Sequence, residues 1–361
     1  MKGVLKLGSV LGIKIEVHWT FTLLLLWVAF LEIQQGASLD RIFFNEVLIL
    51  VLFVCVVLHE LGHALTARRF NINTQKILLL PVGGVATLDK MPEKPGQELL
   101  VAFAGPAVNV LIALLLYFIV PVKSYFNFEA LILEEVLYQP TFQNFLFYLF
   151  FANVMLVVFN LIPAFPMDGG RVLRALLSFR LGRVVATKIA SSIGQGLAIL
   201  FFILGLFFNP FLILIAFFIF FGAYGENKFV KQNSLLQGHV VKEATLTNIS
   251  ILKPTSTVQE VIEITLAGSE KDFVVVENEN IVGIISQKLL VKNARTPSVL
   301  VGKIMEKVFH PIDASLAISK VLELIATEKK DFFPVTDKGK IIGAIDRNNI
   351  SEFILFKTSN S

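Results

Sequence analysis

Cysteine and charged residues are both scarce in this chain. Cys55 is the only cysteine, which excludes a disulfide within the chain and a zinc site built from several thiolates. Only 17% of the residues are charged, whereas 55% are hydrophobic and Phe alone occurs 34 times. This apolar share exceeds that of an ordinary soluble domain and favours a membrane protein. The net charge of +4 is too mild to indicate a nucleic-acid partner.

The apolar residues are concentrated in the first 225 positions, where they form six long runs. These runs lie at 17–33, 45–67, 98–120, 142–162, 189–208 and 210–224. Most of them reach the roughly 20 residues that a helix needs to cross a bilayer. We therefore expect residues 1–225 to form a multi-pass α-helical membrane domain with about six spans. No small-residue cleavage site follows the first run, so we interpret it as a retained span.

Basic residues are concentrated in alternate loops between these runs. Arg68, Arg69 and Lys76 follow the second run, and Arg180 and Arg183 follow the fourth. The intervening loops are poor in Lys and Arg. The positive-inside rule therefore predicts a cell-membrane protein whose N-terminus and C-terminal tail both lie in the cytoplasm.

The most informative polar residues lie inside the second run, in the sequence HELGH at 59–63. On a helix, residues four apart share a face, so His59 and His63 can bind one metal ion. Zinc suits these ligands, because catalytic zinc takes three protein ligands and keeps the fourth position for water. Glu60 is close enough to take a proton from that water. The alternative is a chance spacing, but ionisable groups within a membrane span are expensive and favour a functional site.

A third ligand must come from another run, and ionisable residues are almost absent from the others. The exception is the segment NLIPAFPMDGGR at 160–171, which ends the fourth run. Its two prolines should end the helix, and Gly169 and Gly170 permit a tight turn that directs Asp168 inward. The alternative is that Asp168 caps a helix at 170–179, because Asp favours that position.

The pairing of these two segments points to a known family. HELGH in a membrane helix, followed about a hundred residues later by NLIPAFPMDGGR, resembles the site-2 protease family of intramembrane zinc metalloproteases. The sequences GPAVN at 105–109 and PVGGV at 81–85 also match that family. The resemblance covers residues 1–225.

This resemblance implies a role for each polar residue of the two segments. One zinc ion per chain is held by His59, His63 and Asp168. Glu60 takes the proton of the attacking water and can pass it to the leaving amine. Asn160 matches a family asparagine near the scissile carbonyl, which implies an oxyanion or substrate-orienting role. The alternative for Asn160 is a hydrogen bond across helices.

The implied reaction is hydrolysis of peptide bonds within or near transmembrane segments of membrane proteins, as in regulated intramembrane proteolysis. The substrate must be extended at the scissile bond, because a helical backbone hides its carbonyls. A strand-like edge can hold such a peptide through main-chain hydrogen bonds. The best candidate for that edge is the segment 77–87, which contains Gly83 and Gly84. The alternative is a hairpin that only covers the site.

The last part of the chain has the composition of a soluble α/β unit, at 240–361, after a polar linker at 226–239. It contains an internal repeat with a spacing of about 60 residues. The first copy is predicted as a helix from 256 and strands at 272–276 and 281–286, and the second as a helix at 315–326 and strands at 332–336 and 341–346. The repeat resembles a tandem pair of cystathionine-β-synthase-type (CBS) domains, which often bind adenine nucleotides.

Ligand-binding CBS copies tend to carry Ser or Thr after the second strand and Asp three residues later. The first copy has Ser286 but Leu289 in the Asp position, and the second has Asp346 and Asn349. Binding of ATP or AMP at Ser286 and Asp346 is therefore open, and a structural pair that supports a homodimer is the alternative. A nucleotide could gate substrate entry only by favouring one arrangement of the membrane domain.

A transporter or channel gated by its CBS pair is the second functional hypothesis. Buried Asp and His side chains can line an ion path. Such a path needs polar residues along its whole length, whereas those of this chain cluster at one depth. The sequence therefore favours the intramembrane zinc endopeptidase.

Overall fold

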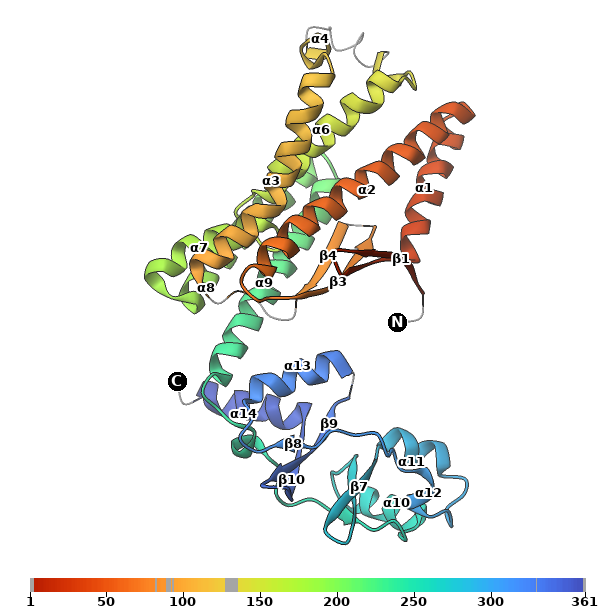
Figure 1. Ribbon diagram of the computed structural model, residues 1–361, viewed down its shortest axis with the longest axis vertical. Coiled ribbons are helices and arrows are strands. Elements are labelled where there is room, and N and C mark those ends of the chain that lie inside the picture. The colour runs from red at the N-terminus through yellow and green to blue at the C-terminus, as the bar shows by residue number, and fades with distance from the viewer. Residues whose placement is uncertain are drawn as a thin grey trace. The chain divides into compact units, whose positions relative to one another are not determined.

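The computed structural model describes residues 3–81, 83–88, 92, 94–126, 136–328 and 330–359. The chain forms two compact units, Met1–Lys228 and Phe229–Ser361. Long helices dominate the first unit, and short strands alternate with helices in the second (Figure 1).

Within the described residues, the first unit contributes to five helices that are long and apolar enough to cross a membrane. They are α2 (Leu39–Arg68), α3 (Pro95–Ile119), α6 (Phe142–Asn160), α8 (Arg183–Phe207) and α9 (Phe211–Leu236). The first apolar run forms a shorter helix, α1 (Thr20–Gln34), with 15 residues. Two further helices of this unit are α4 (Val122–Phe126) and α7 (Asp168–Leu181). The predicted multi-pass helical domain is therefore confirmed.

Helix α2 directs one row of buried side chains toward the protein interior. Its N-terminus is capped by Ser38, whose side chain accepts a hydrogen bond from the backbone of Arg41. Four buried residues follow one another at intervals of four, the spacing that keeps side chains on one helix face. They are Cys55, His59, His63 and Ala67. Several apolar residues on other faces of the helix are exposed, as is typical of a membrane span, among them Leu50, Val54 and Leu58.

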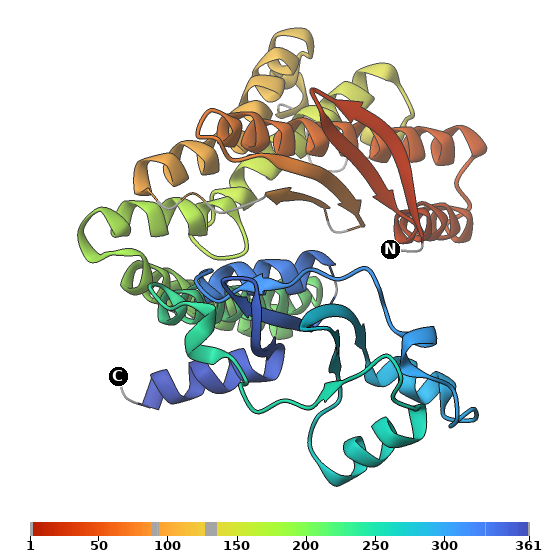
Figure 2. The same ribbon diagram turned by 60° about the horizontal axis from the view of Figure 1, so that its bottom comes forward.

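A four-stranded sheet packs against α2 (Figures 1 and 2). Its strands are β1 (Val4–Val10), β2 (Ile13–His18), β3 (Thr74–Leu80) and β4 (Gly83–Leu88), in that order. The pair β2–β3 is parallel, and the pairs β1–β2 and β3–β4 are antiparallel. Ile13, Ile77 and Leu79 of the sheet pack with Leu61 and Ala64 of α2. This packing fixes β4 as an edge strand beside the helix that carries HELGH.

The second unit contains the predicted repeat. The first copy comprises η1 (Val241–Ala244), β5 (Ile251–Leu252), α10 (Val258–Ala267), β6 (Phe273–Glu277), β7 (Asn280–Ile285) and α11 (Gln287–Asn293). The second comprises α12 (Val301–Ile304), β8 (Ile312–Asp313), α13 (Ile318–Glu328), β9 (Phe332–Asp337), β10 (Lys340–Asp346) and α14 (Arg347–Ser359). Each copy forms a three-stranded sheet with the same pairing. The predicted α/β repeat is therefore confirmed.

The two copies exchange backbone contacts reciprocally. Leu246, which precedes the first sheet, forms a bridge with Ala344 in β10 of the second copy. Glu306, sixty positions after Leu246, forms the corresponding bridge with Ile284 in β7 of the first copy. Each sheet is therefore extended by a segment that belongs to the other copy.

Residues 226–239 were expected to be a polar linker, but the chain is helical as far as Leu236, in α9. Leu236 has no exposed surface and packs in the core of the second copy, together with Val241 and Ile350. Because Leu236 packs in this core, the helix that begins with the last apolar run continues beyond that run, as far as Leu236.

Candidate metal centre

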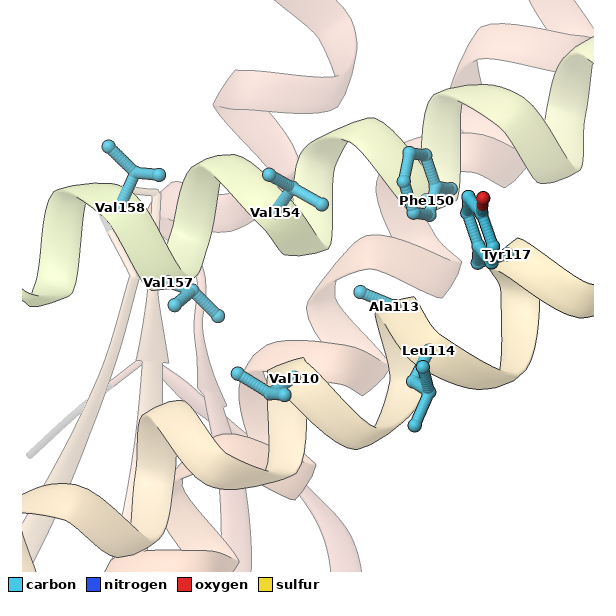
Figure 3. A pocket seen from close by; sticks show the side chains of 8 residues that line it. All are labelled: Val110, Ala113, Leu114, Tyr117, Phe150, Val154, Val157 and Val158. Carbon is cyan, nitrogen blue, oxygen red and sulfur yellow. The ribbon is translucent and has the colours of Figure 1, made fainter. Parts of the chain in front are cut away.

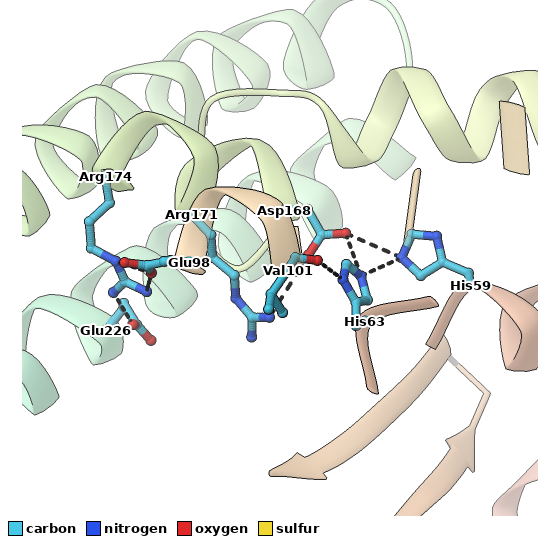
Figure 4. A network of polar contacts seen from close by, with 8 residues as sticks. All are labelled: His59, His63, Glu98, Val101, Asp168, Arg171, Arg174 and Glu226. Carbon is cyan, nitrogen blue, oxygen red and sulfur yellow. Dashed lines mark hydrogen bonds and ion pairs between the residues drawn. The ribbon is translucent and has the colours of Figure 1, made fainter. Parts of the chain in front are cut away.

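Two histidines of α2 and the first residue of α7 meet at one point (Figure 4). The Nε2 atoms of His59 and His63 lie 3.0 Å apart. Oδ2 of Asp168 lies 3.2 Å from Nε2 of His59 and 3.0 Å from Nε2 of His63. All three side chains are buried. Among the residues that the structure describes, this is the one group of three or more metal-ligating side chains found.

The other ring nitrogens of the two histidines face hydrogen-bond acceptors. Nδ1 of His63 lies 2.7 Å from the backbone carbonyl oxygen of Val101, which can only accept, so this nitrogen carries the proton. Nδ1 of His59 lies 2.6 Å from Oδ1 of Asn109. A neutral imidazole that is protonated at Nδ1 presents its lone pair at Nε2. Both lone pairs are therefore aimed at the point where Asp168 meets the rings.

This donor set fits a zinc ion. Ligand atoms about 2.0–2.1 Å from a tetrahedral zinc lie roughly 3.3 Å from one another, close to the separations observed here. Two lone pairs and a carboxylate that converge without a proton repel one another, and a cation at their centre removes that repulsion. Gly105 leaves the space open, because a Cβ at this position would lie 2.1 Å from Nε2 of His63.

Asp168 begins α7 and does not cap it. Helix α6 ends at Asn160, the loop 161–167 contains both prolines, and the N-cap position of α7 is Met167. The Asp168 carboxylate makes no capping bond, and its Oδ1 lies 3.9 Å from Nη1 of Arg171. The capping alternative is therefore wrong.

The predicted reason for Gly169 and Gly170 is also wrong. Both lie within the first turn of α7, and neither has a positive φ. A Cβ on Gly169 would lie 2.3 Å from the carbonyl oxygen of Ile162, and one on Gly170 would lie 2.6 Å from the backbone of Ala164. These positions need glycine because the preceding loop packs directly onto the helix, so a backbone contact and not a turn is the requirement.

Glu60 lies beside the edge strand β4. A Cβ on Gly84 would lie 2.8 Å from Cγ of Glu60, so the strand and this side chain are in close contact. The neighbouring Gly83 has φ +136°, a backbone conformation that favours glycine. Glu60 is half-buried, and no hydrogen bond to its carboxylate occurs among the residues that the structure describes. Val82, which belongs to the predicted substrate edge, lies outside the described residues.

Asn160 is half-buried at the end of α6. Its Nδ2 donates to the carbonyl oxygen of Leu156 at 2.9 Å, one turn earlier in the same helix. Within the described parts of the chain, the cross-helix hydrogen bond considered for Asn160 is not observed. The helix end places this amide near the loop that leads to Asp168.

A second buried polar cluster lies farther along α7 (Figure 4). Arg174 has no exposed surface, and its guanidinium pairs with Glu98 of α3 and Glu226 of α9. The ring of Phe165 lies 4.9 Å from the guanidinium carbon. These residues were not expected from the sequence. The available signal was Glu98, a carboxylate at the start of the third apolar run.

An apolar groove of about 310 Å³ lies between α3 and α6 (Figure 3). Valine, alanine, leucine and aromatic side chains line it, among them Val110, Tyr117 and Val154. Apart from the Tyr117 hydroxyl, the lining offers no polar group that could act on a substrate. The groove is therefore distinct in chemistry from the buried histidines.

The two residues considered for nucleotide binding have different local roles. Oδ1 of Asp346 accepts a hydrogen bond from the backbone of Asn349 at 2.8 Å and caps α14. Ser286 precedes α11 but makes no capping bond. Instead, Oδ1 of Asp272 accepts from the backbone of Gln287 at 3.0 Å. Burial raises the pKa of the Asp272 carboxyl, against the lowering effect of that hydrogen bond.

Comparison with known proteins identifies both units. The model of peptidase family M50 matches residues 47–204, and the CBS domain model matches 241–295 and 301–355. A zinc metalloprotease of Methanocaldococcus jannaschii is 35% identical over 349 residues, which are 96% of this chain and 94% of the relative. The chain belongs to peptidase family M50, the site-2 proteases. Stage IV sporulation protein FB of Bacillus subtilis shares 33% identity with this M50 peptidase over 136 residues, 37% of this chain and 41% of the relative.

Among solved structures, a site-2 protease from Methanocaldococcus jannaschii is 40% identical to this M50 peptidase. That match has a TM-score of 0.45 and covers 62% of this chain and 95% of the other. The predicted family, the metalloprotease class and the tandem CBS pair are confirmed by the family models and the full-length relative. None of these findings supports the transporter alternative.

Proposed function

We propose that this M50 peptidase hydrolyses peptide bonds within or near transmembrane segments of membrane proteins. The observation that carries this proposal is the convergence of His59, His63 and Asp168 in a unit that holds the candidate membrane spans. These three side chains hold one zinc ion. When bound, zinc supplies Lewis acidity that polarises the scissile carbonyl and lowers the pKa of a water molecule.

Glu60 is the general base of the reaction. Its carboxylate has no hydrogen bond within the described residues, so it is free to accept a proton from the attacking water. The same carboxyl then gives that proton to the leaving amine. Asn160 orients the substrate carbonyl, because its amide keeps a second N–H beside the one that bonds Leu156.

The substrate binds as an added strand along β4. This strand is an edge of its sheet, so its outer side offers backbone donors and acceptors to an extended peptide. The contact between Gly84 and Glu60 brings that edge to the catalytic carboxylate. The small residues Gly83 and Gly84 leave room for the peptide close to the site. The alternative, a hairpin that only covers the site, makes no use of the free edge.

The protein resides in the cell membrane with its N-terminus and CBS pair in the cytoplasm. The distribution of Lys and Arg between alternate loops supports this orientation.

The CBS pair binds an adenine nucleotide, ATP or AMP, and regulates the peptidase. The match of both copies to the CBS model and the Ser286 hydroxyl, which does not cap α11, support this role. Calorimetric titration with ATP and AMP tests it, and an absence of heat at millimolar ligand contradicts it. The alternative role, a pair that holds two chains together as a homodimer, predicts a twofold mass in detergent without nucleotide.

Zinc content and cleavage of a membrane-anchored substrate, measured side by side in detergent, test the peptidase proposal. Wild type should hold about one zinc per chain and cleave. Glu60→Gln should keep its zinc and lose cleavage, and Asp168→Asn should lose zinc. Wild type without zinc, or a Glu60→Gln variant that still cleaves, contradicts the proposal.

A further inference from the structure

A chain of buried hydrogen bonds leads from His59 away from the metal centre. Nδ1 of His59 faces Oδ1 of Asn109, and Nδ2 of Asn109 donates to Oδ1 of Asn153 at 2.8 Å. Nδ2 of Asn153 donates in turn to the backbone carbonyl oxygen of Leu149, also at 2.8 Å. Both asparagines have no exposed surface. These hydrogen bonds therefore join α2, α3 and α6 through side chains that water does not reach.

The Leu149 carbonyl oxygen, the last acceptor in this row, fixes the direction of every hydrogen bond from Asn153 back to His59. A backbone carbonyl can only accept, so the NH2 group of Asn153 faces Leu149 and its Oδ1 faces Asn109. The NH2 group of Asn109 is then held toward Asn153, and its Oδ1 toward His59. Because Oδ1 can only accept, the shared proton belongs to Nδ1 of His59. The lone pair of His59 therefore lies at Nε2, toward His63 and Asp168.

We infer that Asn153 is a positioning residue of the metal centre, which holds His59 in its metal-binding tautomer through Asn109. This inference rests on the proposed metal role of His59. Asn153 touches neither the metal position nor a substrate, and it acts only by fixing the orientation of the Asn109 amide. His63 needs no such chain, because a backbone carbonyl binds its Nδ1 directly.

The surroundings of Asn153 leave its amide no other arrangement. Its Nδ2 lies 3.6 Å from Sγ of Cys55, a weak acceptor. Cys55 packs with Leu116 and Leu149 in an apolar cluster. A reversed amide would turn its oxygen toward the Leu149 carbonyl and leave an N–H against the NH2 of Asn109. Two buried pairs would then be unmade, and apolar surroundings make such a loss expensive.

Zinc affinity, measured by competition with a chelator on the full chain in detergent, tests this role without reference to activity. Asn153→Leu removes the acceptor for Asn109, and we expect the zinc dissociation constant to rise about 10- to 100-fold. Asn153→Ser also removes this acceptor, because the short serine hydroxyl bonds within its own helix. This variant should therefore lose as much zinc affinity as Asn153→Leu. Asn153→Asp keeps an acceptor for Asn109, and its protonated form can donate to Leu149, so its affinity should stay close to wild type.

A matched control lies on the same helix. Asn144 is also buried in α6, accepts from the hydroxyl of Tyr125 and donates to the carbonyls of Val136 and Gln139. Asn144→Leu removes as many hydrogen bonds but should leave zinc affinity unchanged. Retained affinity in both Asn153→Leu and Asn153→Ser, or an equal loss in Asn144→Leu, overturns the inference. Wild type that binds no zinc overturns the proposed function itself, so the two failures are distinguishable.

Discussion

Nε of Arg174 lies 2.7 Å from Oε1 of Glu98, and this buried ion pair joins α7 to α3. Both helices serve the metal centre. Asp168 begins α7, and the Val101 carbonyl that binds His63 lies one turn after Glu98 on α3. The pair therefore holds a carboxylate ligand and a histidine partner at a fixed separation.

Replacement of Arg174 by Leu should destabilise the first unit strongly. The change removes Arg174 from the buried carboxylate of Glu98 and the half-buried carboxylate of Glu226. Loss of one partner from a buried ion pair costs on the order of 3–5 kcal/mol. Thermal unfolding in detergent measures this loss. Arg180→Leu changes an exposed residue of the same helix and should have little effect. Equal melting temperatures for wild type and Arg174→Leu would show that the ion pair does not stabilise the unit.

Gly105→Ala should abolish zinc binding. The new methyl group would lie 2.1 Å from Nε2 of His63 and 2.7 Å from Nε2 of His59, in the place of the ion. Zinc content by atomic absorption measures the effect. Gly96→Ala on the same helix is the control, because a Cβ there meets only the Phe179 ring, at 3.9 Å. A Gly105→Ala variant that keeps its zinc contradicts the position of the site.

Gly84→Val should lower cleavage and leave the zinc content unchanged. A branched side chain on β4 would collide with Cγ of Glu60 and crowd the edge along which the substrate is proposed to bind. We expect a loss of at least about tenfold in kcat/KM, since a shift of about 1 Å at a catalytic group has effects of that order or larger. Cleavage at the wild-type rate would argue against the β4 edge as the substrate site.

The stability of the second unit should fall as pH rises through the range in which Asp272 loses its proton. Because burial raises the pKa of this carboxyl in the folded state, the folded chain holds more protons than the unfolded chain between the ordinary and the raised pKa. Stability therefore falls as pH rises through that window. Asp272→Asn cannot ionise, so this fall should disappear, while its amide oxygen can still accept from Gln287.

Asp313 gives a control of opposite sign. The side-chain and backbone hydrogen bonds of Ser315 lower the pKa of the Asp313 carboxyl, so its contribution is present at neutral pH and is lost as pH falls through that lowered pKa. Melting temperatures of wild type and Asp272→Asn across the acid range separate the contributions of the two carboxyls, because Asp272→Asn removes only the first. An Asp272→Asn variant with the wild-type pH profile would show that the half-buried Asp272 carboxyl has no effect on stability.

The features that could be predicted from the sequence are those that depend on the spacing of residues close together in the chain. HELGH places two imidazoles on one helix face, and the prolines before Asp168 end a helix wherever that helix packs. Residues whose partners lie far along the chain could not be predicted in this way. Asn153 bonds a residue 44 positions earlier, and Arg174 bonds one 76 positions earlier. The need for glycine at Gly169 was predicted, but it was attributed to a tight turn. The actual reason, a close contact with the backbone of the preceding loop, leaves no pattern in the local sequence.

The bridges between Leu246 and Ala344 and between Glu306 and Ile284 mean that neither CBS copy is a complete folding module. A chain cut after the first copy would expose an open strand edge, and such edges recruit other chains and promote aggregation. A single copy could complete its sheet only by association with another molecule. The tandem arrangement encloses that association within one polypeptide, so the pairing does not depend on protein concentration.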